Sequence, residues 1–330
     1  MPCLDSLARP ISYLRISVTD RCNLRCIYCM PAEGIPHKFS HDEILRYEEI
    51  ARVVEAAAGL GISKIRLTGG EPLVRLGIAE LVRMIAAVPG IDDISMTTNG
   101  ILLSRHAQEL KAAGLHRVNV SLDTLQPARF RHITRLGELE DVLAGIEAAE
   151  QAGLHPIKIN TVVMRGLNDD EVSDFARLTL ARPWHIRFIE VMPVGETAGL
   201  AKGGFVPVAE IRARIEAEVG PLEPSDGAGR GAGPARYYRL PDAPGTIGFI
   251  SAVSEHFCFH CNRLRLTADG KLRPCLLSDL EVDIRAALRR GAGLEELQDI
   301  LRQAIEQKPA GHHLAEDITA TGRLMSQIGG

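Results

Sequence analysis

Hydrophobic and polar positions follow two alternating periods along the first two thirds of the chain. Short apolar runs bounded by Gly, Asn or Asp have the length and composition of buried strands. Between them lie longer stretches whose apolar residues recur every three or four positions, as on one face of a helix. The pattern predicts strands at residues 13–18, 64–68, 93–97, 117–122, 157–163 and 185–191. It predicts helices at residues 41–58, 78–87, 104–113, 141–152 and 169–181.

Strands that alternate with helices favour a parallel sheet with right-handed crossovers. Periodicity alone fits either a doubly wound sheet or a partial barrel. Polar groups favour the barrel, because Asp20, residues 68–71, residues 97–100 and residues 121–123 all fall at or just beyond predicted strand ends. The carboxyl ends of the strands form the rim where barrel enzymes keep their chemistry. We therefore expect an α/β fold and favour a partial barrel.

The pattern changes after Pro193, which predicts two regions, residues 1–195 and residues 196–330. The second region has predicted helices at 208–219, 283–290 and 294–307, and a loop rich in Gly, Pro and Ala at 221–234. Within that loop, residues 227–232 fit the pattern G-x-G-x-x-A. They follow no strand and open no apolar helix, so we interpret them as a loop and not as a dinucleotide site.

Three cysteines, Cys22, Cys26 and Cys29, are spaced C-x3-C-x2-C directly after the first predicted strand. Chance would produce this spacing about 0.003 times in such a chain. Three neighbouring thiolates are suited to a soft metal centre. A structural zinc normally takes four protein ligands, whereas a four-iron cluster on three thiolates leaves one iron open to another molecule. The spacing favours the cluster, and a zinc site is the alternative.

A second group, Cys258, Cys261 and Cys275, lies in the C-terminal region. Residues 263–267 and 271–273 flank an Asp-Gly turn and predict a hairpin that brings Cys275 back towards the other two. A zinc site completed by His256 or His260 also fits these residues. Cys3 is left over and has no predicted role.

Composition limits the location and the function class. Hydrophobic residues make up 45% and charged residues 24%, as in ordinary globular proteins. A net charge of −4 argues against a nucleic-acid binder. The start of the chain has no apolar signal region, and no apolar run is long enough to span a membrane. Cysteines grouped in threes suit a reducing compartment. We expect a cytoplasmic protein that binds neither membranes nor nucleic acids.

The first cysteine group, with Tyr28 before its third cysteine, resembles the signature of the radical S-adenosylmethionine (SAM) superfamily. Further motifs narrow the resemblance: T-D-R-C-N-L-R-C-x-Y-C-M-P, R-L-T-G-G-E-P-L, T-T-N-G, C-x2-C-N-R-L-R-L-T-A-D-G-x-L-R-P-C and a terminal Gly-Gly. Together they are similar to the GTP 3′,8-cyclase (MoaA) family over nearly the whole chain. His260 departs from this pattern, since the family often has a small or acidic residue there.

The resemblance implies an incomplete (β/α)6 TIM-type barrel with a C-terminal cluster-binding extension, in agreement with the polar rim. It also implies a lyase of molybdenum cofactor biosynthesis with two 4Fe-4S clusters and SAM as cofactors. In that family a 5′-deoxyadenosyl radical takes hydrogen from ribose C3′ of GTP, and C3′ then attacks purine C8. No side chain acts as acid or base. The product is (8S)-3′,8-cyclo-7,8-dihydroguanosine 5′-triphosphate. The partners implied are an electron donor and cyclic pyranopterin monophosphate synthase, the next enzyme of the pathway. The oligomeric state stays open, a homodimer being one option.

Site residues follow from matching the family's positions to this sequence. Iron ligands are expected at Cys22, Cys26, Cys29, Cys258, Cys261 and Cys275. SAM contacts are expected at Tyr28, Gly70, Ser121 and Met192, and GTP contacts at Arg15, Arg66, Thr97, Lys158, Arg263 and Arg265. The tail residues Gly329 and Gly330 are expected to reach the active site.

Two other functions are compatible with parts of this pattern. A radical SAM enzyme acting on a peptide would also use a second cluster, but it would not need Arg66 and Lys158 within apolar strands or Arg263 and Arg265 beside the second cysteine group. A zinc-binding interaction module would explain the cysteines alone. Cations inside apolar strands favour a phosphorylated substrate.

Overall fold

The computed structural model describes residues 3–194, 199, 203–226, 233–312 and 322–329. Residues 227–232 and Gly330, both named in the sequence analysis, lie outside the described residues. The division predicted at residue 195 also falls on a residue outside them, and it stays a prediction.

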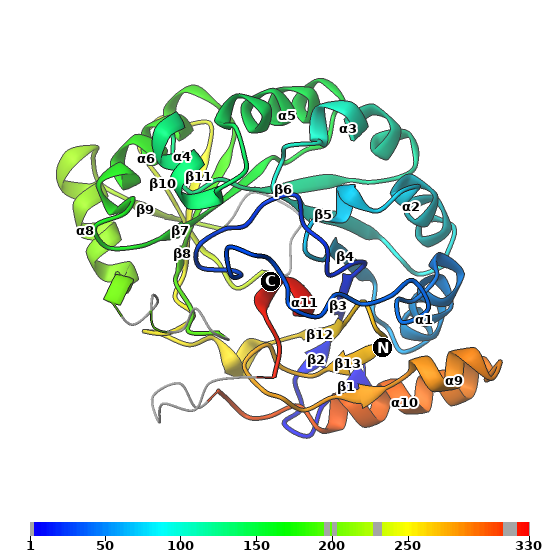
Figure 1. The fold of residues 1–330 in the computed structure, drawn as a ribbon. Helices are drawn as coiled ribbons and strands as arrows, with labels where there is room; N and C mark the ends of the chain where they lie inside the picture. Colours follow the sequence, from blue (N-terminus) through cyan, green and yellow to red (C-terminus); the bar gives the residue numbers. More distant parts are fainter. Residues whose placement is uncertain (1–2, 195–198, 200–202, 227–232, 313–321, 330) are drawn as a thin grey trace.

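Six parallel strands form the centre of a strongly curved sheet (Figure 1). They are β3 (Tyr13–Ser17), β4 (Lys64–Thr68), β5 (Asp93–Thr98), β6 (Arg117–Ser121), β7 (Lys158–Val163) and β8 (His185–Glu190). Each pairs in parallel with the next along the chain. All six predicted strands and their parallel order are confirmed. The strands can run parallel because every connection between them is long enough to carry a helix.

Helices cover the outside of this sheet (Figure 1). They are α1 (Tyr47–Gly59), α2 (Ile78–Ala86), α3 (Leu103–Ala112), α4 (Pro127–Thr134), α5 (Leu139–Gln151) and α6 (Val172–Ala181). Helix α4 was not predicted. Helix α1 begins later than expected, because the Glu49 carboxylate accepts the Arg46 backbone N–H at 2.7 Å and caps the helix there. The predicted helix 169–181 is divided, since Asp169–Glu171 forms a 3₁₀ turn before α6.

The C-terminal region extends the same sheet at both edges. Strand β12 (Arg263–Leu266) pairs in parallel with β3, and β11 (Thr246–Ile250) pairs in parallel with β8. Antiparallel strands continue beyond each: β13 (Lys271–Arg273) and β14 (Val282–Asp283) on one side, β10 (Arg236–Arg239) and β9 (Glu223–Ser225) on the other. The predicted hairpin is confirmed by the pairing of β12 with β13. Strand β11 was missed.

The remaining elements surround this frame. Helices α8 (Val208–Glu218), α9 (Arg285–Arg289) and α10 (Leu294–Glu306) lie outside the sheet, while α11 (Met325–Ile328) lies at the centre of the barrel (Figure 1). A separate pair, β1 (Cys3–Leu4) and β2 (Pro10–Ile11), lies near the N-terminus. Among the described residues, no helix has both the length and the apolar character needed to cross a bilayer.

Candidate active site

A deep cavity opens at the carboxyl ends of the parallel strands. It offers about 320 Å³ to the centres of water molecules, within a hollow of about 2030 Å³ that includes its open mouth. Residues from β3 to β8, from β11 and β12 and from the tail line it. This is the end of the barrel where the sequence predicted the chemistry.

The first cysteine triad lies on the loop after β3. Backbone groups tie this loop to the turn after β4: Gly70 N–H donates to Thr19 C=O at 2.7 Å and Glu71 N–H to Arg21 C=O at 2.8 Å. A Cβ at Gly70 would meet the Arg21 carbonyl oxygen at 2.3 Å, so only glycine fits there. The Arg135 guanidinium further fixes the loop by donating to Arg25 C=O at 2.9 Å. These contacts hold Cys22, Cys26 and Cys29 at the cavity wall.

The second triad lies across the same cavity. Cys258 and Cys261 flank a 3₁₀ turn, and Cys275 follows β13. The Lys308 ammonium joins the two arms of this triad, because it donates to Arg263 C=O at 2.8 Å and to Pro274 C=O at 2.6 Å. The Arg9 guanidinium donates to Cys258 C=O at 2.8 Å. All six cysteines therefore line one cavity.

The donor sets fit iron–sulfur clusters. All six cysteines are free thiols. Burial raises the pKa of Cys22 to about 11 and that of Cys29 to about 12, so an uncompensated thiolate would be costly in the first triad. In the second, Arg263 and Lys308 outweigh burial and lower the pKa of Cys261 to about 6. Three soft thiolates in each triad are the ligand set of a four-iron cluster with one iron left open.

Two histidines raised as zinc ligands differ in position. Both are exposed, but His256 lines the cavity and His260 does not. Among the described residues, no three His, Cys, Asp or Glu side chains converge on a position for a single metal ion.

The residues expected to contact SAM all line the cavity: Tyr28, Gly70, Ser121 and Met192. The Tyr28 hydroxyl donates to the Asp123 carboxylate at 2.6 Å, and that carboxylate accepts Val162 N–H at 2.8 Å. Burial raises the pKa of Asp123 to about 6. Glu71 accepts the Asn99 and Leu73 backbone N–H groups at 2.7 and 3.0 Å, yet burial still raises its pKa to about 7.

Five of the six residues expected to contact GTP line the cavity: Arg15, Arg66, Thr97, Arg263 and Arg265. Burial lowers the pKa of both Arg66 and Arg265 to about 10, because the guanidinium groups are desolvated and repel neighbouring cations. Lys158 does not line the cavity. It is buried beside Tyr237, whose ring centre lies 5.9 Å from Nζ, and burial with nearby Arg187 lowers its pKa to about 7.

Arg187 is a cavity residue that the sequence analysis missed. It is buried on β8 and donates to the Asn119 side-chain oxygen at 2.6 Å. Its signal was present, because it stands between Ile186 and Phe188 as Arg66 stands between Ile65 and Leu67. Also missed were Asn160, Lys308, His312, Met325 and Ser326. Tertiary contacts alone bring most of these to the cavity.

Several buried polar atoms at the cavity have no hydrogen-bond partner among the described residues. They are Thr68 Oγ1, Thr97 Oγ1, Asn160 Oδ1 and Arg187 Nε. A buried polar atom without a partner is costly, so these atoms favour a polar ligand in the cavity.

The C-terminal tail also reaches the cavity. Met325 and Ser326 line it, and Gly329 C=O accepts a hydrogen bond from Arg265 at 2.6 Å. A Cβ at Gly329 would meet Thr68 Oγ1 at 2.6 Å.

Comparisons with known proteins agree with this geometry. The Radical SAM superfamily model matches residues 16–179, and the Molybdenum Cofactor Synthesis C model matches residues 184–314. A GTP 3′,8-cyclase of Pelotomaculum thermopropionicum is 57% identical over 326 residues, 99% of each chain. One of Heliobacterium modesticaldum is 57% identical over 329 residues, 99% of this chain and all of that one.

Solved structures share the fold at low identity. Streptococcus suis SuiB bound to S-adenosylmethionine has a TM-score of 0.62 at 12% identity, covering 88% of this chain and 67% of that one. The structure of native anSMEcpe with bound AdoMet has a TM-score of 0.52 at 15% identity, covering 93% and 82%. These likenesses support the partial barrel.

The barrel, its rim of cysteines and the family-model match define a radical SAM protein. The chain belongs to the GTP 3′,8-cyclase family, as full-length identities of 57% show. This family catalyses the first step of molybdenum cofactor biosynthesis, and its cofactors are two 4Fe-4S clusters and SAM.

Proposed function

We propose that this cavity converts GTP to (8S)-3′,8-cyclo-7,8-dihydroguanosine 5′-triphosphate, with each cysteine triad holding one cluster. The observation that carries the proposal is the shared cavity: two free-thiol triads and at least five buried or half-buried arginines line one hollow. A peptide substrate would not call for so many desolvated cations, whereas a triphosphate carries the charge to compensate them.

When bound, the clusters and SAM would supply the electron that cleaves SAM and the 5′-deoxyadenosyl radical that takes hydrogen from ribose C3′; once C3′ has bonded to purine C8, one further electron from the electron donor and a proton complete the dihydropurine. The chain's own part is to bind, orient and exclude water. No side chain is assigned as acid or base. Asp123, already committed to Tyr28 and Val162 N–H, serves to hold the tyrosine in place.

We propose that SAM lies beside the first triad. The turn at residues 69–71 presents backbone groups there without side-chain obstruction, because Gly70 approaches the Arg21 carbonyl too closely for any other residue. Tyr28, Ser121 and Met192 complete the binding surface from the cysteine loop, β6 and the end of β8. The fixed tyrosine hydroxyl then limits where the ligand can lie.

We propose that GTP lies beside the second triad, with its phosphates directed towards the buried cations. Arg263 and Arg265 reach the cavity from β12, Arg15 and Arg66 from β3 and β4, and Arg187 from β8. Register places Arg15, Arg66 and Arg265 side by side on adjacent strands. These guanidinium groups are already held together in the absence of ligand, so little reorganisation is needed when an anion binds. Lys158 lies on β7 outside the cavity lining and adds positive charge near Arg187.

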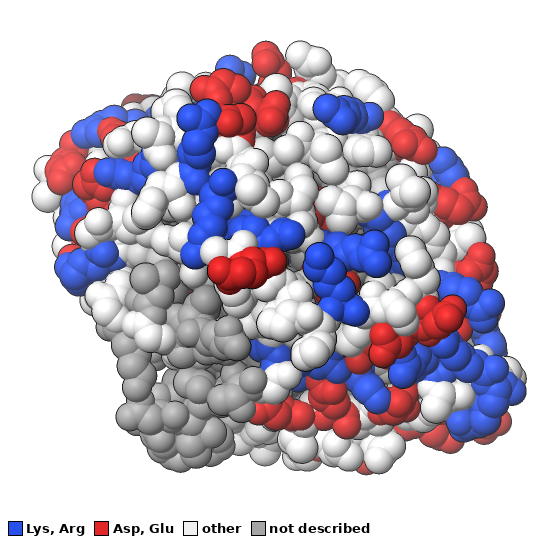
Figure 2. Space-filling view, in the orientation of Figure 1, with Lys and Arg blue, Asp and Glu red and all other residues white. Residues whose placement is uncertain are grey.

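The electron donor is proposed to dock beside the first triad. In Figure 2, Lys and Arg side chains gather across the middle of the face that looks into the barrel. Arg21, Lys38 and Arg135 are exposed on or next to the loop that carries this triad. A carrier with an acidic surface would be steered to them.

The product is proposed to pass to cyclic pyranopterin monophosphate synthase. A cytoplasmic location is proposed as well, because free cysteines in two triads need a reducing compartment. We also propose that the chain divides into two regions, residues 1–195 and 196–330, and that it forms a homodimer.

The deciding experiment is anaerobic turnover with GTP, SAM and a reductant, with the product identified by mass spectrometry. The expected product has the mass of GTP and a new bond between C3′ and C8. Formation of 5′-deoxyadenosine without that product, while GTP is present in excess, would contradict the proposal.

A further inference from the structure

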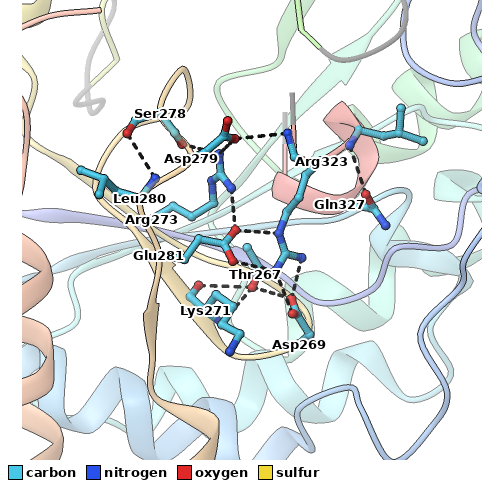
Figure 3. Close-up of polar contacts among 12 residues, drawn as sticks. Thr267, Asp269, Lys271, Arg273, Ser278, Asp279, Leu280, Glu281, Arg323 and Gln327 are labelled. Atoms are coloured by element: carbon cyan, nitrogen blue, oxygen red, sulfur yellow. Dashed lines mark hydrogen bonds and ion pairs between the residues drawn. The ribbon is translucent and has the colours of Figure 1, made fainter. Parts of the chain in front are cut away.

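A partly buried arginine, Arg323, fastens the tail to the second cysteine region (Figure 3). The Arg323 guanidinium donates to Asp269 at 2.9 Å through Nη1 and 2.8 Å through Nη2. It also donates to Glu281 at 2.6 Å through Nε and 2.9 Å through Nη2. The side chains of Arg323 and Asp269 are only 13% and 9% exposed. A single guanidinium group therefore binds two carboxylates at once, an arrangement that a lysine cannot reproduce.

Both carboxylates are themselves held in place. Asp269 lies on the turn between β12 and β13, where its Oδ1 accepts the Thr267 hydroxyl at 2.7 Å. Glu281 precedes β14 and accepts Arg273 Nη1 at 2.5 Å. Arg323 also lies over the Phe39 ring, 5.7 Å from its centre, on the loop of the first triad. The arginine is thus fixed against the structures that carry both triads.

The tail beyond Arg323 contacts each side of the cavity in turn. Leu324 packs with Met30 and Ile35, next to Cys22 and Cys29. Ser326 lies at the cavity wall, where its backbone N–H favours the thiolate form of Cys29 and so partly offsets the rise in the pKa of Cys29 caused by burial. At the far end, Gly329 C=O accepts from Arg265 on β12. A few residues therefore bridge the two proposed ligand sites.

We propose that Arg323 is a positioning residue for the cyclisation, which holds residues 324–329 across the cavity so that their backbone bridges the two cysteine triads. The inference rests on the proposed function and adds to it a fixed point for the tail. Without that point, the short α11 has too few residues to keep its place by helical propensity.

We call the contacts of Arg323 with Asp269 and Glu281 the clamp. A clamp that positions the tail and an ion pair that only adds stability predict different results. If Arg323 only adds stability, its loss lowers the melting temperature and leaves the tail in place. If it positions the tail, its loss releases the tail locally, and the hydrogen-bonded backbone N–H groups of Leu324 and Gln327 become exposed to solvent.

The experiment compares wild type, Arg323→Ala and Arg323→Lys as anaerobically prepared full-length holoprotein. Arg214→Ala is the control, because Arg214 also forms part-buried contacts with a carboxylate but lies on α8, away from the tail. Hydrogen exchange is followed by mass spectrometry in the peptide containing residues 323–329. Iron content, melting temperature, 5′-deoxyadenosine and cyclised product are measured on the same samples.

In Arg323→Ala we expect the tail amides to exchange at least about tenfold faster, with exchange in β3–β8 unchanged. Cyclised product per 5′-deoxyadenosine should fall about tenfold, Arg323→Lys should be intermediate, and Arg214→Ala should match wild type. Unchanged tail exchange in Arg323→Ala would overturn the proposal. Should that variant not fold, Arg323→Lys and Glu281→Gln decide by the same exchange readout. If wild type itself makes no cyclised product, the proposed function fails while the exchange still reports on the clamp.

Discussion

The arginines of the cavity wall are costly to bury, and the chain supplies few acidic groups to offset them. Arg187 donates to the neutral side-chain oxygen of Asn119 at 2.6 Å, and its Nε has no hydrogen-bond partner among the described residues. Desolvated cations of this kind are retained where a ligand compensates them. The desolvation cost of these arginines is consistent with a polyanionic ligand.

Replacing Arg187 by Met should weaken GTP binding by tenfold or more and leave SAM binding unchanged. A hydrogen bond to a charged group contributes roughly 1.5–3 kcal/mol, which corresponds to about tenfold or more in affinity. Separate anaerobic titrations with each ligand measure the two affinities. Arg239→Met is the control, because Arg239 is exposed on β10. Equal loss of GTP and SAM affinity would show that Arg187 supports the whole cavity instead.

His185 gives the protein a pH-dependent stability. Burial, aided by Lys158 and Arg187, lowers its pKa to about 4, and its Nδ1 contacts the Thr246 hydroxyl at 2.5 Å. Since the unfolded chain binds the proton more readily, stability is present above the ordinary pKa near 6.5 and is lost as pH falls towards 4.

We therefore expect the free energy of unfolding of wild type to fall between pH 7 and pH 5 by on the order of 2 kcal/mol more than that of His185→Gln. Urea unfolding of the holoprotein at both pH values measures the difference. The same pH dependence in both proteins would remove His185 as its cause.

At the scale of elements, strands and their order were predictable, whereas helix starts and added strands were not. Strands β3 to β8 carry apolar runs long enough to be recognised, and their polar ends pointed to the rim. Helix α1 starts at Tyr47 only because a particular carboxylate caps it, and β11, beside β8, contains a glycine and follows a loop rich in Pro and Gly. Pairing partners distant in sequence determine such elements.

The turn at Gly70 is an element whose geometry can be tested directly. In Gly70→Ala the new Cβ would meet the backbone oxygens of Arg21 and Asp20 at 2.3 and 2.8 Å, so the loop of the first triad must move. We expect iron content to fall from about eight towards about four per chain. Gly293→Ala is the control, because nothing lies within 4 Å of a Cβ there. Full iron content in Gly70→Ala would mean that the loop tolerates the shift.

For the whole molecule, the C-terminal region closes around the barrel and supplies the second wall of the cavity. Its strands join both edges of the central sheet, so the second triad lies just before β12 and just after β13, beside the first strand of the barrel. The two triads were predicted as separate groups in sequence. That they face one cavity depends on this parallel pairing of β12 with β3, for which periodicity offered no signal.

This arrangement predicts different failures for the two triads. Cys26→Ala removes a ligand from the site proposed for SAM, so we expect no 5′-deoxyadenosine at all. Cys258→Ala removes one from the site proposed for GTP, so some SAM cleavage should persist while cyclised product is lost. Both variants should lose about half of the iron.

Anaerobic assays of iron, 5′-deoxyadenosine and cyclised product on the same preparations distinguish these outcomes. Cys3→Ala is the matched control, because Cys3 is a free thiol on β1 that does not line the cavity. It should behave as wild type in all three assays. Normal cyclised product from Cys258→Ala would contradict a substrate role for the second triad. Persistent SAM cleavage by Cys26→Ala would contradict the first assignment, because two thiolates hold a four-iron cluster too weakly to sustain turnover.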